Sequence, residues 1–479
     1  MALPQILVFS IFAWLAGWLV PARWRIWVLC AASLIAIYWL QPSTPIRNLD
    51  FWLPTASIFL VTFTWVVTRV PAGQNPRQAA SGFAIILGVV LLVGITRYTA
   101  PFCCLTPSRP PALWQILLVL ALAGALLAIP SRLLPRARIY PILSILLILA
   151  LFITLKFVPL AARASAGLRA AAGQSTDFAS SADLAWLGFS YLAFRLLHTL
   201  RDDQSGKLPP LSLHEFITYA LFFPAQTAGP IDRVQHFATE LRQSIALEKS
   251  QAFPEHWRIG SQRILLGVFK KFILADSLAL LALSAQNASQ VNSTGWAWVL
   301  LYAYTLRIYF DFSGYTDIAL GISKLLGISL PENFERPYLK QNLTAFWNSW
   351  HITLAQWFRA YFFYPLTRAL RTRSSPLPAW VIVLLGQVAT MLLIGLWHGI
   401  TWNFAIWGLW HGLGLFIHNR WADWTRPRLA ARQVPPNWHR LLQGSGWLLT
   451  FNYVALGWVW FALPDPAASW SFLHRLIGF

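Results

Sequence analysis

Charged side chains are scarce in this chain: Asp, Glu, Lys and Arg together make up 11% of its 479 residues. Soluble globular proteins carry about 25% of these residues. Acidic residues are the rarer kind, with 17 Asp and Glu against 37 Lys and Arg, so the formal net charge is +20. The composition excludes an ordinary soluble enzyme and predicts a chain with largely apolar surroundings.

Cysteine is also nearly absent. The three cysteines, Cys30, Cys103 and Cys104, have neither metal-ligand spacing nor the pattern of a disulfide framework. A Gly-x-Ser-x-Gly motif is missing as well, so a covalent serine mechanism has no support. These absences exclude a disulfide-stabilised secreted domain and leave other groups to carry any chemistry.

Hydrophobic residues, in contrast, make up 57% of the chain, and Trp occurs 27 times. A spanning helix needs about 20 mostly apolar residues. Such stretches lie at residues 4–20, 26–42, 51–68, 80–96, 112–130, 139–158, 184–200, 213–228, 263–285, 296–310, 379–397, 402–418 and 446–463. Several later ones are short or carry charge, so we predict an all-α, polytopic membrane protein with roughly eleven transmembrane helices plus re-entrant or interfacial helices.

Loop arginines predict the orientation of the first six spans, because cytoplasmic loops carry an excess of Lys and Arg. Odd loops contain Arg23, Arg25, Arg69, Arg77, Arg132, Arg136 and Arg138, whereas even loops contain Arg47, Arg97 and Arg109. We therefore expect the odd loops in the cytoplasm and the N-terminus outside the cell membrane. The positive charge then faces anionic lipids, and no nucleic-acid partner is expected.

Changes in composition along the chain predict three segments. Residues 1–175 contain no histidine and are expected to form a transmembrane scaffold. A small, polar connection at residues 161–182 leads into a catalytic core at residues 176–418. Residues 419–479 are expected to form a basic cytoplasmic loop, at 419–441, and a last transmembrane helix.

Two Trp-His-Gly triplets lie within the very apolar stretch GLWHGITWNFAIWGLWHG, residues 395–412. A histidine inside a bilayer is costly unless it is paired, hydrated or used, so His398 and His411 are candidate functional residues. On one straight helix they are separated by about 220° of rotation and about 19 Å of rise, on nearly opposite faces. Either the glycines break the helix or only one histidine does chemistry. We adopt the second interpretation, with packing as the alternative role for His411.

A third histidine follows a stretch of aromatic residues. Residues 343–361 have the spacing of a largely apolar helix face that includes Trp350. A Trp-rich amphipathic helix of this kind belongs at the membrane interface or dips partway into it. His351 lies at its apolar margin, where an interfacial cap and a functional role are both open, and Arg359 lies on its polar side.

Polar residues also occur beside helix breaks. The span at 184–200 places Arg195 and His198 on one helix face, and we expect a helix end where His198 meets water. The prolines and glycine of FFPAQTAGPIDR, residues 222–233, break a helix within apolar sequence. Such breaks survive at membrane depth where protein or a water cavity satisfies the freed backbone. This favours a cavity wall around Gln226, with a simple span end as the alternative.

The stretch RIYFDFSGYTD, residues 307–317, contains a possible ion pair. Arg307 and Asp311 are four residues apart, which brings their side chains together on a helix. We expect Gly314 to end or kink this helix and to leave Ser313 at a polar break.

Four stretches, in this order, resemble the membrane-bound O-acyltransferase family. They are FFPAQTAGPIDR at 222–233, GVFKKFILAD at 267–276, the segment from YFDFSGYTD to AYFFYPL at 309–366, and GLWHGITWNFAIWGLWHG at 395–412. The likeness covers residues 184–418 and is strongest to the bacterial branch, which includes membrane proteins of alginate O-acetylation and of teichoic-acid D-alanylation.

This resemblance implies a polytopic helical fold and O-acyltransferase activity. It matches His398 to the family's essential intramembrane histidine and His351 to the family's second characteristic position. The chain departs from the family where residues 348–349 are Asn-Ser in place of Arg-Arg, and where Ala360 replaces an Asp after Arg359. Both departures affect the expected identity of the acceptor or partner more than the expected acyl-transfer reaction.

We therefore expect an acyl group, which the resemblance implies is acetyl, to pass from a cytoplasmic thioester to a hydroxyl group. The acceptor is expected to be a cell-surface or exported polysaccharide, or a partner acyltransferase outside the membrane. His398 is expected to act as general base, since an unperturbed histidine pKa of about 6.5 suits that role, and His351 to position or polarise a reactant. Candidate substrate-binding residues are Gln226, Asp311, Ser313, Trp350, Arg359, Trp397, Asn403 and His411.

No tightly bound cofactor is expected, because the donor, acetyl-CoA or another acyl thioester, is a co-substrate. No metal is expected either, since the histidine spacing lacks a zinc motif. Membrane lipids are a further partner. The alternatives are a transporter of polysaccharide or lipid-linked sugar, which predicts internal repeats, acylation of a lipid or teichoic-acid-type acceptor, and a non-catalytic relative.

Overall fold

A computed structural model describes residues 1–68, 76–99, 104–129, 139–246, 253–375, 377–431 and 435–478. Over these residues the chain is helical, apart from connections and one isolated β-bridge between Phe334 and Trp350. The predicted all-α fold is therefore confirmed. The predictions for Arg69, Cys103, Arg132, Arg136 and Arg138 lie outside the described residues.

The chain divides into two compact units. One consists of Met1–Ile264 and Ile318–Leu330, and the other of Leu265–Asp317 and Pro331–Phe479. Two helices, α11 (Phe253–Val268) and α14 (Thr294–Leu325), contribute residues to both units.

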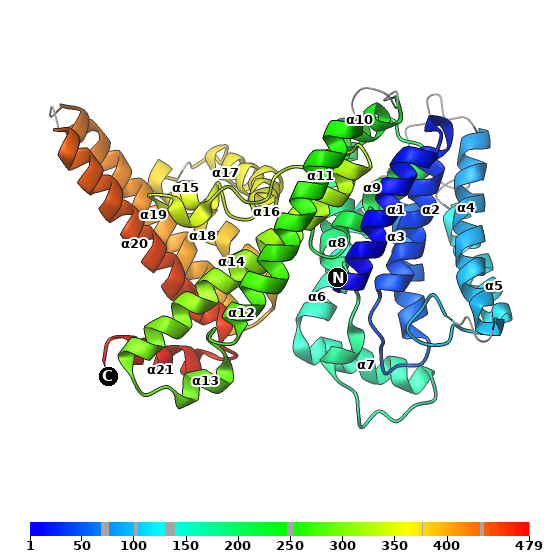
Figure 1. Ribbon diagram of the computed structural model, residues 1–479, viewed down its shortest axis with the longest axis horizontal. Helices are drawn as coiled ribbons and strands as arrows, with labels where there is room; N and C mark the ends of the chain where they lie inside the picture. Colours follow the sequence, from blue (N-terminus) through cyan, green and yellow to red (C-terminus); the bar gives the residue numbers. More distant parts are fainter. Residues whose placement is uncertain are drawn as a thin grey trace. The chain divides into compact units, whose positions relative to one another are not determined.

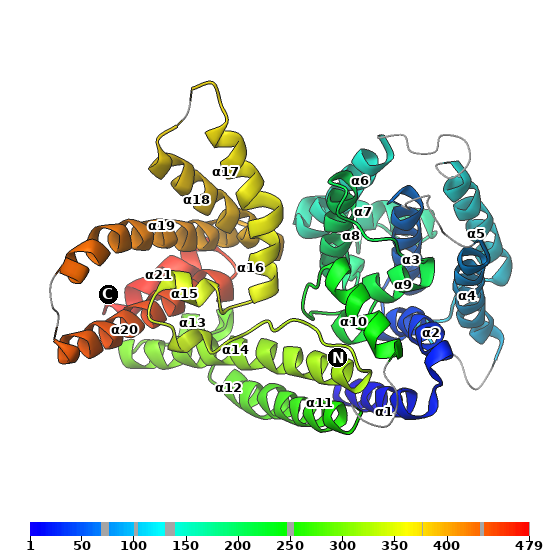
Figure 2. The same ribbon diagram turned by 90° about the horizontal axis from the view of Figure 1, so that it is seen from above.

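The first unit is a helical bundle in which α4 and α5 lie side by side at one edge (Figures 1 and 2). Its long helices are α1 (Leu3–Leu19), α2 (Ala22–Leu40), α3 (Leu49–Thr68), α4 (Pro76–Ile95), α5 (Leu113–Ala128), α6 (Ile139–Lys156), α7 (Val158–Ala171), α8 (Phe189–Gln204), α9 (Leu213–Ala220) and α10 (Val234–Ala246). Short 3₁₀ turns lie at Thr96–Tyr98, Ser181–Leu184 and Phe223–Ala225. Because α7 covers half of the predicted polar connection, that segment is more helical than expected.

Five described helices are long and apolar enough to cross a membrane, namely Ala22–Leu40, Leu49–Thr68, Arg77–Tyr98, Ile139–Lys156 and Ala379–His398. Two further apolar helices, Leu3–Leu19 and Leu113–Ala128, are shorter. These helices agree with a multi-pass membrane protein, whereas the total of roughly eleven spans stays a prediction.

A buried arginine stabilises the helix break predicted near Gln226. Helix α9 ends at Ala220, and the chain does not continue as one span through residue 228. Arg195 of α8 donates hydrogen bonds to the carbonyl oxygens of Ala220 and Ala225, at 2.9 and 3.0 Å. These bonds satisfy backbone groups that the break frees, which is the requirement for irregular backbone in apolar surroundings.

His198 is not at a solvated helix end, contrary to expectation. Its side chain is fully buried, and its Nε2 atom is hydrogen-bonded to the hydroxyl group of Tyr219 at 2.7 Å. Helix α9 packs over this turn of α8, and the spacing of residues within α8 alone does not predict that contact.

The second unit contains a π-helical turn (Phe269–Ala275), α12 (Asp276–Ala279), α13 (Ala285–Gln290), α15 (Leu343–Trp347), α16 (Ile352–Phe358), a second π-helical turn (Arg359–Phe363), α17 (Tyr364–Arg371), α18 (Ala379–His398), α19 (Trp402–Ala431), α20 (Pro436–Ala462) and α21 (Pro466–Leu476), with a 3₁₀ turn at Pro337–Leu339. A hydrophobic core cluster joins α13, α14, α20 and α21. Helix α20 is therefore not the last element of the chain, contrary to expectation.

Gly314 does not end α14, which continues to Leu325. A Cβ atom at Gly314 would lie 2.8 Å from the carbonyl oxygen of Gly267 and 2.9 Å from the backbone nitrogen of Lys271. The glycine thus permits a close helix crossing. Asp311 pairs with Lys271 and not with Arg307, and Lys270 Nζ lies 2.7 Å from Asp317.

Helices α18 and α19 form a tight antiparallel hairpin (Figure 2). A Cβ atom at Gly395 would clash with the carbonyl oxygen of Phe404, and one at Gly408 would lie 2.6 Å from that of Met391. Only glycine allows the two backbones to approach this closely. The helix does break between His398 and Trp402, the interpretation that we set aside above.

The stretch at 419–441 is not the loop that its composition suggests. Helix α19 continues to Ala431 and α20 begins at Pro436. Its exposed Trp421, Trp424 and Trp438 are therefore carried on helices.

Candidate functional site

His351 lies in a tight turn that interrupts the predicted amphipathic helix. Helix α15 ends at Trp347 and α16 begins at Ile352, so the aromatic stripe does not run along one helix. His351 itself has a φ of 43°, in the left-handed region. Non-glycine residues rarely adopt this conformation, and such residues cluster at functional sites.

The His351 side chain is buried, with 3% exposure. Its Nδ1 atom is hydrogen-bonded to Asn333 Oδ1 at 3.0 Å, and its Nε2 atom is buried with no hydrogen-bond partner among the described residues. Its ring contacts Phe312 at 4.7 Å between centroids and Trp397 at 6.1 Å. Outside the spanning helices, burial lowers the pKa of His351 to about 3, which keeps this imidazole neutral at physiological pH.

His398 is the last residue of α18 and, unlike His351, is only partly buried. Its ring contacts those of Trp397, Phe404, Trp407 and Phe461, at 4.5, 5.8, 5.7 and 4.8 Å between centroids. Trp397 therefore contacts both His351 and His398. The turn after α18 explains this exposure, because it ends the helix at His398.

His411 is fully buried on α19 and has no hydrogen-bond partner at either ring nitrogen within the described part of the chain. Trp347 and Trp407 contact it at 5.2 and 5.0 Å between centroids. Because Trp407 also contacts His398, the two histidines of the repeated triplet belong to one aromatic cluster. His398 and His411 therefore do not lie on opposite faces of one straight helix, since the turn after α18 folds α19 back along α18.

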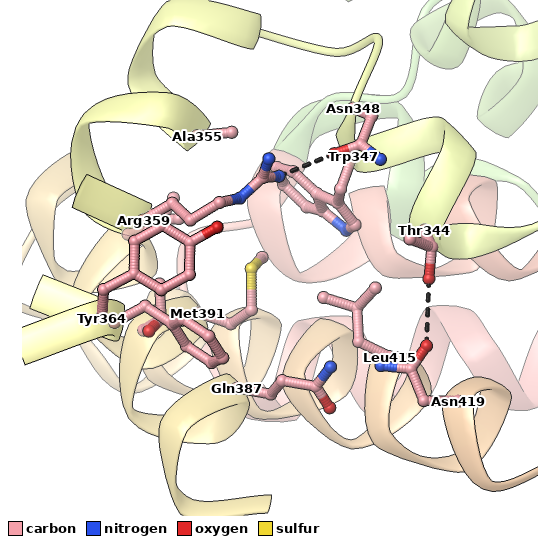
Figure 3. Close-up of a pocket in the computed structure, with 13 residues that line it drawn as sticks. Thr344, Trp347, Asn348, Ala355, Arg359, Tyr364, Gln387, Met391, Leu415 and Asn419 are labelled. Carbon is pink, nitrogen blue, oxygen red and sulfur yellow. Dashed lines mark hydrogen bonds between the residues drawn. The ribbon is translucent and has the colours of Figure 1, made fainter. Parts of the chain in front are cut away.

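A cavity of about 340 Å³ opens beside this cluster (Figure 3). It is lined by Thr344, Trp347, Asn348, Ala355, Arg359, Phe363, Tyr364, Gln387, Thr390, Met391, Ile394, Leu415 and Asn419. Arg359 donates a 2.6 Å hydrogen bond to Asn348 Oδ1, and none of the described lining residues is acidic. Ile394 precedes His398 by about one turn on the same face of α18, so the cavity and His398 share this helix.

Trp350 and Asn403 contribute to packing. Trp350 is buried and contacts Trp458, which in turn contacts His411. Asn403 Nδ2 donates to the carbonyl oxygen of Leu463 at 2.7 Å and to Ser469 Oγ at 3.0 Å. Asn403 thus links the start of α19 to the residue that follows α20 and to α21, and its amide donors are already engaged.

The remaining candidates lie in different surroundings. Asp311 is half exposed and paired with Lys271, while the Ser313 hydroxyl is buried with no partner among the described residues. Gln226 belongs to the first unit, where it packs against Gly188. Over the described residues, no group of three His, Cys, Asp or Glu side chains is placed to hold a metal ion.

Two residues of this region were not singled out from the sequence. The sequence pattern does not indicate Asn333, because this residue lies in a proline-bounded segment, 18 residues before the histidine that it contacts. Gln387 lines the cavity with a buried Oε1 that has no partner in the described part of the chain. An amide within the apolar span of α18 was the available signal for Gln387, since buried polar groups in a membrane helix are costly.

Comparison with known proteins places these features in a family. The model of the MBOAT, membrane-bound O-acyltransferase family, matches residues 137–455. The probable alginate O-acetylase AlgI of Pseudomonas aeruginosa is 34% identical over 295 residues, 61% of this chain and 52% of that protein. The teichoic acid D-alanyltransferase of Streptococcus thermophilus is 32% identical over 290 residues, 58% of this chain and 68% of that protein.

A third relative, the peptidoglycan O-acetyltransferase of Helicobacter pylori, is 32% identical over 278 residues. These residues are 56% of this chain and 48% of the relative. The chain thus matches about half the length of two of these relatives. The family match includes His351, the cavity residues, His398 and His411, and with it the chain belongs to the membrane-bound O-acyltransferase family.

Proposed function

We propose that this protein is a membrane-embedded O-acyltransferase of the cell membrane. It moves an acyl group from a cytoplasmic thioester donor to a hydroxyl group, and acetyl is the first candidate for this acyl group. Family membership and three relatives named as O-acetylase, O-acetyltransferase and D-alanyltransferase support this class of reaction. The observation that carries the proposal is His398, a partly exposed imidazole at the end of an apolar helix long enough to span a membrane.

In the proposed reaction, His398 takes the proton from the acceptor O–H group while the oxygen attacks the thioester carbonyl carbon. A C–O bond forms, the C–S bond breaks, and the imidazolium returns the proton to the leaving thiolate. The products are an ester and a thiol. A positioned general base typically contributes about 10²–10⁴-fold to the rate. His351 positions the reacting hydroxyl group.

We assign the cavity beside α18 to the donor. Arg359 brings a positive charge to it, and the lining carries no negative charge to neutralise that guanidinium. Arginine binds phosphate groups strongly, and the phosphates of acyl-CoA or of a carrier-bound acyl group are the anions that a thioester donor brings. Thr344, Gln387 and Asn419 supply polar groups for the rest of such a donor.

The acceptor in this proposal is a cell-surface or exported polysaccharide, reached directly or through a partner acyltransferase outside the membrane. The names of the relatives refer to alginate, peptidoglycan and teichoic acid, which are polymers made or modified at the cell envelope. Acylation of a teichoic-acid-type acceptor is therefore the second candidate within the same reaction class.

The test uses the purified full-length protein in liposomes, with radiolabelled acetyl-CoA outside and alginate oligosaccharides inside. The proposal expects time-dependent release of CoA thiol and labelled ester on the oligosaccharide. A second set of liposomes with labelled oligosaccharide and no acetyl-CoA tests transport. Movement of sugar without consumption of acetyl groups would support the transporter alternative and overturn the proposal.

A further inference from the structure

Asn333 is held rigidly beside the histidine turn. The isolated β-bridge between Phe334 and Trp350 fixes the segment after Pro331 to the turn. In addition, the backbone nitrogen of Ile352 donates to the carbonyl oxygen of Asn333 at 2.9 Å. The Asn333 side chain is fully buried, so its amide has one defined orientation.

The hydrogen bonds of Asn333 identify which of its amide atoms faces His351. The backbone N–H of Thr353, which can only donate, lies 3.2 Å from Oδ1, and the Thr353 hydroxyl donates to the same atom at 2.9 Å. That atom must therefore be the amide oxygen, because an amide NH₂ group cannot accept a bond from a backbone N–H.

The identity of this oxygen fixes the tautomer of His351. A carbonyl oxygen can only accept, so the His351 Nδ1 atom at 3.0 Å must carry the hydrogen. In a neutral imidazole the other nitrogen then has a free lone pair. His351 Nε2 and Asn333 Nδ2 are both buried without partners among the described residues, so an acceptor and a donor remain unused.

We propose that Asn333 is a positioning residue, which holds His351 in the Nδ1–H tautomer and so keeps Nε2 as a hydrogen-bond acceptor for an O–H group of the acceptor other than the one whose proton His398 takes. This inference rests on the proposed acyl transfer. It also excludes one of the two roles predicted for His351, the polarisation of a carbonyl group. A bare Nε2 accepts from an O–H group, whereas stabilisation of a carbonyl oxygen requires an N–H donor.

The left-handed backbone of His351 fits this role, because the turn rather than a helix directs the ring. The groups packed on the ring are uncharged: Phe312 comes from α14, Trp397 from α18 and Asn333 from the bridged segment. Because Nε2 is buried, a hydroxyl group that reaches it must displace part of this aromatic cover.

Nitrogen NMR of ¹⁵N-histidine-labelled full-length protein in nanodiscs tests the tautomer without any activity. The His351→Gln variant assigns the signal by its loss. We expect Nδ1 protonated and Nε2 unprotonated in the wild type and in Thr353→Val, which weakens the same turn but keeps the bond to His351. In Asn333→Ala the two tautomers should mix. A wild-type ring protonated at Nε2, or an unchanged tautomer in Asn333→Ala, overturns the proposal.

Acetyl transfer then separates a positioning role from loss of folding. We expect Asn333→Ala to lower kcat about 10²-fold, within the range of general-base help, with little change in KM for the thioester. Asn333→Asp keeps the acceptor oxygen, so it should retain kcat at alkaline pH. It should lose activity at a higher pH than the wild type on acidification, because the carboxylate favours charged His351, which has no Nε2 lone pair.

Equal kcat in Asn333→Ala and wild type, with the tautomer changed, would contradict the positioning role. If the wild type transfers no acetyl group at all, the proposed function fails, while the NMR result still decides the role of Asn333 in setting the tautomer.

Discussion

Three histidines of the second unit illustrate how surroundings set the role of one residue type. His411 is enclosed by aromatic rings, His351 is tied to an amide oxygen, and His398 alone retains partial exposure. A buried imidazole without exchangeable neighbours is poorly placed to pass protons to a substrate. The residue surroundings therefore favour His398 as the base and His411 as a packing residue.

The packing role of His411 depends on a glycine. A Cβ atom at Gly457 of α20 would lie 2.9 Å from His411 Nε2 and 3.1 Å from Trp410 Cδ1. We expect Gly457→Ala to destabilise the protein by about 1–3 kcal/mol, as overpacking does. Thermal unfolding in detergent measures this change.

Gly444, also on α20, is the matched control because a Cβ atom there meets no atom within 4 Å. Gly444→Ala should leave the unfolding temperature unchanged or raise it, since alanine favours helix. Equal effects of the two substitutions would show that the space around His411 is not filled as described.

At the same scale, Arg359 is predicted to bind the donor. We expect Arg359→Ala to raise KM for acetyl-CoA about tenfold or more, because a hydrogen bond to a charged group contributes about 1.5–3 kcal/mol. Arg371, at the end of α17, is exposed and does not line the cavity. An equal rise in KM for Arg371→Ala would argue for a general charge effect rather than a donor site.

At the scale of secondary-structure elements, two ion pairs flank the close crossing at Gly314. The side chain of Asp317 is 5% exposed beside Lys270, whereas that of Asp311 is 51% exposed beside Lys271. Removal of one partner from a buried pair typically costs about 3–5 kcal/mol, while an exposed pair contributes about 0–1 kcal/mol. Lys270→Met should therefore destabilise the protein much more than Lys271→Met.

Unfolding measurements on the two lysine variants check this order. A loss from Lys271→Met as large as that from Lys270→Met would contradict this account of the crossing.

The elements also show what sequence alone predicts. Apolar periodicity and length identified helices such as α3 and α18, because membrane spans obey a local rule. The predicted spans at 379–397 and 402–418 also placed a break after His398, but the turn at His351 and the close contacts across that break were not predicted, since both depend on long-range contacts. Asn333 reaches His351 through a β-bridge, and Gly395 faces Phe404 only after the chain reverses. The sequence indicated that aromatic residues surround the site, but not which rings contact one another.

At the scale of the whole molecule, the arginine pattern predicts the membrane orientation. Three engineered cysteines at exposed positions test it: Ala2→Cys and Ser175→Cys are expected outside, and Gln78→Cys is expected in the cytoplasm. A membrane-impermeant maleimide should label the first two in intact cells and the third only after lysis. The reverse pattern would place the N-terminus inside and reverse the predicted orientation.

The whole-molecule account depends most on His398 as the base of acyl transfer. The direct measurement compares release of thiol and labelled ester from radiolabelled acetyl-CoA by the wild type and by His398→Ala. Both proteins must first show the same monodisperse elution and unfolding temperature. We expect His398→Ala to lower kcat by about 10²–10⁴-fold. Full transfer activity in a correctly folded His398→Ala protein would contradict the account.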